Sequence, residues 1–172
     1  RFGKTGKLDL ELELGVWIGG GNDIGQPIPI AEAAEYVAGF CLLNDWSARE
    51  IQSWEYQPLG PFLAKNFLTT VSPVIVTPEA LAPFRAAAMP RGADEPQPLT
   101  YLLDADDQVH GGLSLDLGVW LQTARMRETG EPEVRISASE AGNLYWTVAQ
   151  MVAHHSSGGC ALRAGDLFGT GT

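Results

Sequence analysis

A short polar segment, NDWSAREIQSWEY at residues 44–56, concentrates side chains that can do chemistry. Ser47, with an acid three residues later, is typical of a capping box and predicts a helix that begins there. On this helix Arg49, Gln52 and Tyr56 are spaced i, i+3 and i+7, so they share one face. The guanidinium and the amide can donate hydrogen bonds to negative charge that develops on a substrate oxygen.

Three acids in the first 45 residues are candidate metal ligands. Glu11 and Glu13 are i and i+2 in LDLELEL, which places both carboxylates on one face of a strand, with Cα atoms ~6–7 Å apart. A solvated strand face would explain this pair alone. Asp45, however, follows the apolar run GFCLLN, where an unpaired acid is costly to bury. Three converging carboxylates would favour Mg²⁺ or Ca²⁺ over zinc or copper.

Other polar residues have a structural and a chemical interpretation. Lys65, in FLAKNF, is either a surface lysine whose stem covers apolar neighbours or a cation beside a metal-bound anion. His154 and His155 are adjacent near a predicted helix end, and one of them could act as an acid or base. Neighbouring helical residues point ~100° apart, so a structural role is preferred over joint metal binding.

The elements that must position these residues are mostly short strands. LDLELEL alternates strictly, which predicts a half-buried strand with leucines on one face and acids on the other. The overall pattern predicts a mainly β architecture with short helices (α+β). The other expected elements are a helix at 31–37, strands at 39–45 and 72–78, an irregular excursion at 83–98, two or three antiparallel strands within 101–123 with Asp106 and Asp107 in a turn, and a helix at 143–155.

Bulk composition narrows the function classes. With 172 residues and 45% hydrophobic residues, the chain is expected to form a single domain. A net charge of −10 argues against a nucleic-acid surface, and no apolar run is long enough to span a membrane. Cys41 and Cys160 lie far apart and are predicted to be buried thiols in a reducing compartment, which points to the cytoplasm. Both ends lack typical terminal features, which predicts a part of a longer polypeptide.

Several motifs together resemble the fumarylacetoacetase (fumarylacetoacetate hydrolase) family. The similarity covers nearly the whole chain, and WEYQPLGPF followed by a lysine and a Thr-Thr pair is its most specific part. The matching segments are LDLELELGVWIGGGN, QPIPIAEA, LLNDWSAREIQSWEYQPLGPFLAKNFLTT and NLYWTVAQMVAHHSSGGCALRAGDLFGTGT.

The resemblance implies a fold, a reaction and a set of roles. The fold is the mixed β-roll of the family's C-terminal catalytic domain, usually a homodimer, and the substrate is a β-diketo acid that a metal-dependent hydrolase cleaves at a carbon–carbon bond. The resemblance implies that Mg²⁺ or Ca²⁺ binds at Glu11, Glu13, Asp45, Lys65 and Thr69. It implies that Arg49, Gln52 and Lys65 stabilise the oxyanion. It also implies that Gln52, Tyr56 and Thr172 contact the substrate.

The resemblance also implies parts outside this chain and leaves alternatives open. A further metal-binding Asp, a water-activating His and an N-terminal domain are expected upstream of the ELE strand, and a supporting Glu downstream of Thr172. The alternatives are an acylpyruvate hydrolase or oxo-acid decarboxylase of the same superfamily, and a non-catalytic metal-binding or dimerisation module.

Overall fold

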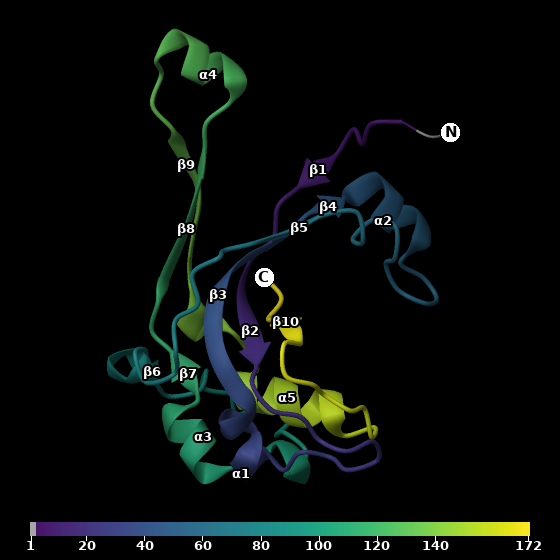
Figure 1. Ribbon diagram of the computed structural model, residues 1–172, viewed down its shortest axis with the longest axis vertical. Helices are drawn as coiled ribbons and strands as arrows, with labels where there is room; N and C mark the ends of the chain where they lie inside the picture. The colour runs from purple at the N-terminus through teal and green to yellow at the C-terminus, as the bar shows by residue number, and fades with distance from the viewer. Residues whose placement is uncertain (1–2) are drawn as a thin grey trace.

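A curled antiparallel sheet forms the centre of the protein. The computed structural model describes residues 3–172, and its main sheet has the order β10-β2-β3-β5 (Figure 1). Leu14 of β2 pairs with Leu42 of β3, and Phe168 of β10 pairs with Val16 of β2. The strands are β2 (Leu12–Ile18), β3 (Val37–Asp45), β5 (Thr69–Val71) and β10 (Leu167–Gly169). The predicted mainly β architecture with few short helices is confirmed.

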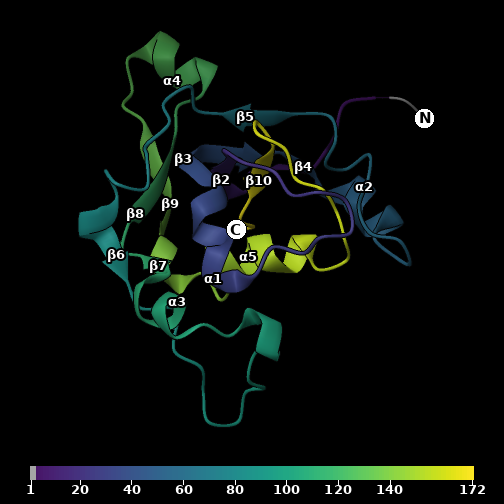
Figure 2. The ribbon, with the colours of Figure 1, turned by 60° about the horizontal axis from the view of Figure 1, so that its bottom comes forward.

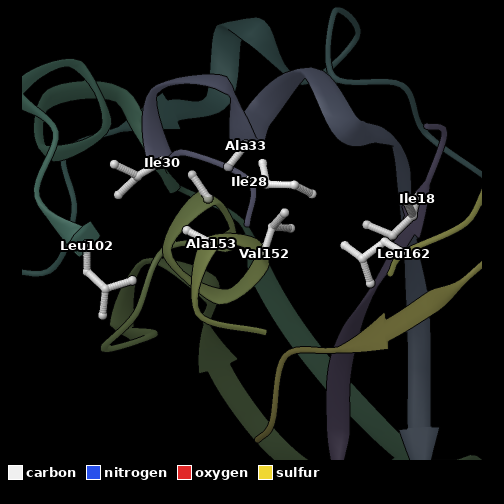
Figure 3. Close-up of a cluster of buried hydrophobic side chains, with 9 residues drawn as sticks. Ile18, Ile28, Ile30, Ala33, Leu102, Val152, Ala153 and Leu162 are labelled. Atoms are coloured by element: carbon white, nitrogen blue, oxygen red, sulfur yellow. The ribbon is translucent and has the colours of Figure 1, made fainter. Parts of the chain in front are cut away.

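Short helices close one end of this sheet. Helix α5 (Val148–Ser156) packs against α1 (Ile30–Ala33) below the strands, as two views show (Figures 1 and 2). Thr147 begins α5 with a capping box, because its Oγ1 accepts from the Gln150 N–H at 3.1 Å and its own N–H donates to Gln150 Oε1 at 3.0 Å. These helices, the end of β2 and the nearby loops share a buried cluster that comprises Ile18, Ile28, Ile30, Ala33, Leu102, Ala149, Val152, Ala153 and Leu162 (Figure 3).

A long hairpin leaves the body of the protein. Strands β8 (Asp116–Leu121) and β9 (Val134–Glu140) pair along their length and carry α4 (Ala124–Thr129) at the far end (Figure 1). The remaining elements are β1 (Leu8–Asp9), η1 (Ala34–Tyr36), β4 (Ser47–Ala48), α2 (Arg49–Glu55), η2 (Ala82–Phe84), β6 (Arg85–Ala86), η3 (Thr100–Leu102), α3 (Ala105–His110), β7 (Gly112–Leu113) and η4 (Ala141–Asn143). Among residues 3–172, none of the helices has the length and apolar character needed to cross a membrane.

Two predictions near the site were wrong in detail. The strand predicted from LDLELEL is interrupted at residues 10–11, because β1 pairs with β4 whereas β2 pairs with β3. Leu8 is therefore 54% exposed, and Glu13 is only 6% exposed because β2 is buried on both faces. The expected capping box at Ser47 is also absent, since Ser47 lies in β4, where its hydroxyl donates to the Asp45 carbonyl.

Three further predictions were wrong for local reasons. Residues 72–78 form only an isolated bridge at Val76, because Pro73 has no N–H to donate to a ladder. Asp106 and Asp107 lie in α3 rather than a turn, because the Asp104 carboxylate accepts their backbone N–H groups and caps the helix. Cys160 is exposed, whereas Cys41 is buried as predicted.

Two helix predictions had the right type but inexact bounds. The helix expected at 31–37 is observed as α1 followed by the short turn η1, which together end at Tyr36. The helix expected at 143–155 begins only at Val148, after its Thr147 cap. The strand expected at 39–45 is confirmed within β3.

Candidate functional site

Three carboxylates converge where β2 begins and β3 ends. Glu11 lies in the link between β1 and β2, Glu13 lies in β2, and Asp45 is the last residue of β3. One ligand oxygen from each lies within 4.8 Å of the others. The antiparallel register places Leu12 opposite Asn44, which brings the start of β2 next to the end of β3. The convergence predicted from the sequence is therefore present.

The backbone around Glu11 is held by the end of β3. The Glu11 N–H donates to Asn44 Oδ1 at 3.0 Å, and the Asp45 N–H donates to the Glu11 carbonyl at 3.0 Å. Asn44 thus continues the connection between the two segments beyond the break in strand pairing. These bonds fix the spacing between the Glu11 and Asp45 backbones.

Two cations contact the Glu11 carboxylate, one at each oxygen. Lys65 Nζ lies 2.5 Å from Oε2 and also 3.1 Å from Asp45 Oδ2, and Arg49 Nη2 lies 2.8 Å from Oε1. Burial alone would raise the pKa of Glu11, but the hydrogen bonds from Lys65 and Arg49 together outweigh it and lower that pKa. Glu11 is therefore ionised at neutral pH and can act as an oxygen ligand.

Glu13 has a different environment. Its Oε2 accepts the Gly171 N–H at 3.0 Å, which links β2 to the segment after β10. Burial is the main cause of a raised pKa for Glu13, and the neighbouring charges of Asp45 and Glu11 raise it further. A cation between these carboxylates would remove both the repulsion and the cost of burying the charge.

The donor set and its charge fit a hard divalent cation. When all are ionised, four carboxylates (Asp9, Glu11, Glu13 and Asp45) face two cations (Arg49 and Lys65), which leaves two negative charges uncompensated. The three clustered ligands are carboxylate oxygens, the donor type that Mg²⁺ and Ca²⁺ prefer. The residues present therefore match a divalent ion in both charge and ligand chemistry.

Asp9 is a site residue that the sequence analysis did not assign. Its Oδ2 lies 2.9 Å from Arg49 Nε, and this hydrogen bond is the main cause of a lowered pKa for Asp9 and a raised pKa for Arg49. Arg49 Nη1 donates to Gln52 Oε1 at 2.7 Å. All three guanidinium nitrogens therefore have a partner, which fixes the orientation of the group. The sequence offered one signal for Asp9, because it lies two residues before Glu11, on the same face of the predicted strand as Glu11 and Glu13.

The other predicted residues differ in how they relate to this cluster. Thr69 of β5 is the register partner of Asp45, and Gln52 is one helical turn after Arg49. Thr172 donates from its hydroxyl to the Leu12 carbonyl at 3.0 Å, beside Glu13. Tyr56, the residue after α2, has an exposed side chain, and its backbone N–H donates to the Gln52 carbonyl at 3.0 Å.

A cavity of about 750 Å³ adjoins Glu13, whereas Glu11 and Asp45 do not line it. It lies between the start of β2, the chain end after β10 and the base of the β8–β9 hairpin. Of the predicted site residues, Glu13 and Thr172 are among those that line it, whereas Gln52 and Tyr56 are not. Tyr145, Trp146 and Ile136 contribute apolar surface. The cavity is large enough for a small organic acid.

Gly169 keeps room for the Glu13 carboxylate. A Cβ at Gly169 would lie 2.3 Å from Glu13 Oε2, so the carboxylate would have to leave its bond with the Gly171 N–H. We expect Gly169→Ala to weaken Mg²⁺ or Ca²⁺ binding about tenfold, as loss of a ligand's supporting contact usually does. Isothermal titration calorimetry measures this. The control is Gly142→Ala, where the nearest atom is 3.5 Å away, and equal affinities in the two variants would contradict the prediction.

The two adjacent histidines have structural contacts away from the carboxylates. His154 Nδ1 lies 2.8 Å from the Tyr101 hydroxyl, and the His155 ring packs on Phe168 with centroids 4.8 Å apart. His155 Nε2 also lies 3.5 Å from Cys160 Sγ. The preference for structural roles near the end of α5 agrees with these contacts.

Comparison with known proteins identifies similar chains. The model of the C-terminal domain of fumarylacetoacetate (FAA) hydrolase matches residues 1–172. A fumarylacetoacetase of Oryza sativa subsp. japonica is 47% identical over 171 residues, which are 99% of this chain and 38% of that protein. The fumarylacetoacetase of Homo sapiens is 44% identical over 171 residues, with the same coverage, 99% and 38%. The chain thus spans well under half the length of these curated relatives.

A solved structure shows the same fold. The fumarylpyruvate hydrolase of Pseudomonas aeruginosa, solved in complex with Mn²⁺ and pyruvate, superimposes with a TM-score of 0.62 at 24% sequence identity. The match covers 100% of this chain and 57% of that one. At this identity the likeness establishes the fold alone, and it agrees with the β-roll that the sequence analysis expected.

Proposed function

Because the chain belongs to the fumarylacetoacetate hydrolase family, we propose that it carries the catalytic site of a hydrolase that cleaves a carbon–carbon bond of a β-diketone. The proposed substrate is fumarylacetoacetate, and the products are fumarate and acetoacetate, as in the last step of tyrosine catabolism. The observation that carries this proposal is the convergence of Glu11, Glu13 and Asp45 with Lys65 and Arg49 in a chain 47% identical to a fumarylacetoacetase.

The proposed site holds Mg²⁺ or Ca²⁺. Glu11, Glu13 and Asp45 supply carboxylate ligands, and Thr69 lies beside Asp45 in the register of β3 and β5. A bound divalent cation acts as a Lewis acid toward carbonyl oxygens. Lys65, which contacts two of the three carboxylates, limits how far Glu11 and Asp45 can move apart.

Three residues are proposed to stabilise the oxyanion that forms when water adds to the substrate carbonyl. Within residues 3–172, Arg49 uses three of its five N–H groups on Asp9, Glu11 and Gln52, and Lys65 uses two of three on carboxylates. Gln52 accepts from Arg49 through Oε1, so its NH₂ group keeps two donors. The donors that remain can bind negative charge as it develops.

In the proposed reaction, the carbon–carbon bond breaks as the tetrahedral adduct collapses to a carboxylic acid. The leaving carbon departs as an enolate and takes up a proton to give the second acid. Gln52, Tyr56 and Thr172 are proposed to orient the substrate. The water-activating histidine and a fourth acid ligand are proposed to lie outside the 172 residues, in a longer polypeptide with a further N-terminal domain.

The test of the proposed function is direct turnover. The longer polypeptide that supplies the histidine and the fourth acid ligand should hydrolyse fumarylacetoacetate, measured as loss of diketone absorbance, with little activity on acetylpyruvate or on oxo-acids that would decarboxylate. Preference for acetylpyruvate would favour an acylpyruvate hydrolase, and carbon dioxide release from an oxo-acid would favour a decarboxylase. Cation binding without turnover of any of these would favour the non-catalytic metal-binding or dimerisation module.

We also propose that the protein works as a homodimer in the cytoplasm. The projecting hairpin exposes large apolar side chains, among them Trp120, Leu121, Val134 and Ile136, each 48–55% exposed. Apolar surface of this kind on a projecting element is typical of an interface. Sedimentation velocity should give the mass of two chains, and a single-chain mass at micromolar concentration would refute the dimer.

A further inference from the structure

Lys65 lies at the end of a loop that apolar packing does little to fix. The connection from α2 to β5 covers residues 56–68, and four of its large apolar side chains are between 46% and 64% exposed: Phe62, Leu63, Phe67 and Leu68. Ala64 is the only fully buried residue of this connection. Yet the residue after it places its ammonium within 3.1 Å of two carboxylates. Polar contacts must therefore hold the loop in place.

Glu55, the last residue of α2, supplies three of these contacts. Its Oε1 accepts the N–H groups of Phe62 and Ala64, each at 2.7 Å, and its Oε2 accepts the N–H of Leu63 at 3.2 Å. The Ala64 N–H is the main cause of a lowered pKa for Glu55, and those of Phe62 and Leu63 add to it. An ionised carboxylate with three donors forms stronger hydrogen bonds than a neutral acceptor would.

The contacts of Glu55 are continuous with those of Lys65. Ala64 is also held through its carbonyl, which accepts the N–H of Ala48 in β4 at 2.9 Å. The Lys65 N–H then bonds to the Phe62 carbonyl at 3.1 Å. Glu55 therefore holds the three residues immediately before Lys65, and the same helix carries Arg49 and Gln52 at its other end.

We propose that Glu55 is a positioning residue, which holds the 62–64 segment so that Lys65 reaches Glu11 and Asp45. Glu55 acts through the backbone and touches neither the carboxylate cluster nor the cavity beside it. The catalytic consequence rests on the proposed function, but the effect on the position of Lys65 does not. Both can be measured separately.

The first measurement needs no turnover. The chain has three lysines, and Lys4 and Lys7 are exposed whereas the Lys65 side chain is 19% exposed. In the full chain loaded with Mg²⁺, limited acetylation by acetic anhydride followed by mass spectrometry reports the reactivity of Lys65 relative to the other two. Glu55→Ala should raise this relative reactivity about tenfold, since outer contacts of a site typically contribute 10- to 100-fold. Unchanged reactivity in a folded Glu55→Ala protein overturns the proposal.

Two more variants separate positioning from general destabilisation. Glu55→Gln keeps an Oε1 acceptor for Phe62 and Ala64 but presents an NH₂ to the Leu63 N–H, so Lys65 reactivity should be intermediate. The matched control is Glu50→Ala on the same helix, which removes contacts to Thr5 and Gly6 instead and should leave Lys65 reactivity at the wild-type level. An equal rise in the Glu50 and Glu55 variants would show loosening of α2 as a whole and refute the proposal.

The second measurement is a double-mutant cycle on turnover of fumarylacetoacetate by the longer polypeptide that includes the proposed histidine. Glu55→Ala should lower kcat about tenfold in the wild-type background. It should have little further effect in a Lys65→Met background, because a residue that acts through Lys65 has nothing to position there. Full additivity overturns the proposal. If the wild-type protein does not turn over this substrate, the proposed function fails, while the acetylation result still decides whether Glu55 positions Lys65.

Discussion

Asp45→Asn is expected to weaken binding of Mg²⁺ or Ca²⁺ by at least ~100-fold, since it removes a charged oxygen ligand rather than only a supporting contact. Asp45 lies at the end of β3, with one oxygen within 4.8 Å of ligand oxygens of Glu11 and Glu13. The asparagine keeps a carbonyl oxygen but loses the negative charge, and it also loses the ion pair with Lys65 at 3.1 Å. Calorimetric titration of the full chain measures the affinity.

The control for this variant is Asp9→Asn. It removes one negative charge from the same region, but Asp9 contacts Arg49 and is not one of the three clustered ligands. Its cation affinity should fall much less, because a long-range charge effect is screened by water and salt. Equal losses in the two variants would mean that total charge, rather than coordination by Asp45, determines binding. Unchanged affinity in Asp45→Asn would remove Asp45 from the ligand set.

The parts of the site that the sequence predicted depend on local spacing. Glu11 and Glu13 are two residues apart, and Arg49 and Gln52 are three apart, so the periodicity expected of a strand or a helix related their side chains, although Glu11 lies just before β2. The convergence with Asp45 followed from the cost of leaving an acid unpaired after an apolar strand. These inferences needed no knowledge of the tertiary structure.

The contacts that were not predicted join residues far apart in the sequence. Arg49 and Asp9 are 40 residues apart, and the Gly171 N–H and Glu13 are 158 apart. Both depend on which strands are neighbours in the sheet, and β10, near the end of the chain, pairs with β2, near its start. Glu55 was overlooked for another reason, because its partners are backbone N–H groups, which are present at every residue but proline and leave no mark in a sequence.

The same distinction applies to the fold. Residues 39–45 were predicted as a strand because they form an apolar run, and β3 confirms the strand. Helix α3 was missed because its signal is a single capping residue, Asp104, in a segment whose alternating apolar residues indicated strands. The sequence did not show that the hairpin of β8 and β9 projects from the protein, because the exposure of its apolar residues depends on the surrounding structure.

Arg49→Met is expected to reduce kcat on fumarylacetoacetate by about 100- to 1,000-fold, with a much smaller change in KM. The reason is that a donor directed at charge that develops only in the transition state contributes little to binding of the ground state. In the structure, Asp9, Glu11 and Gln52 fix the guanidinium, so it does not need to reorganise during the reaction. Gln52→Leu should have a smaller effect, because a neutral amide forms a weaker hydrogen bond with an anion.

The Arg49→Met experiment must separate an oxyanion role from an effect on cation binding. Arg49 also contacts Glu11 Oε1 at 2.8 Å, so its loss changes the charge around a proposed ligand. Steady-state kinetics should therefore be measured at saturating Mg²⁺, with the cation affinity of the variant determined separately. Arg49→Lys tests geometry at constant charge, and it should recover little of kcat, because an ammonium cannot contact Asp9, Glu11 and Gln52 from three nitrogens at once. A tenfold or greater rise in KM with kcat unchanged would instead assign Arg49 to substrate binding, and the oxyanion role would be wrong.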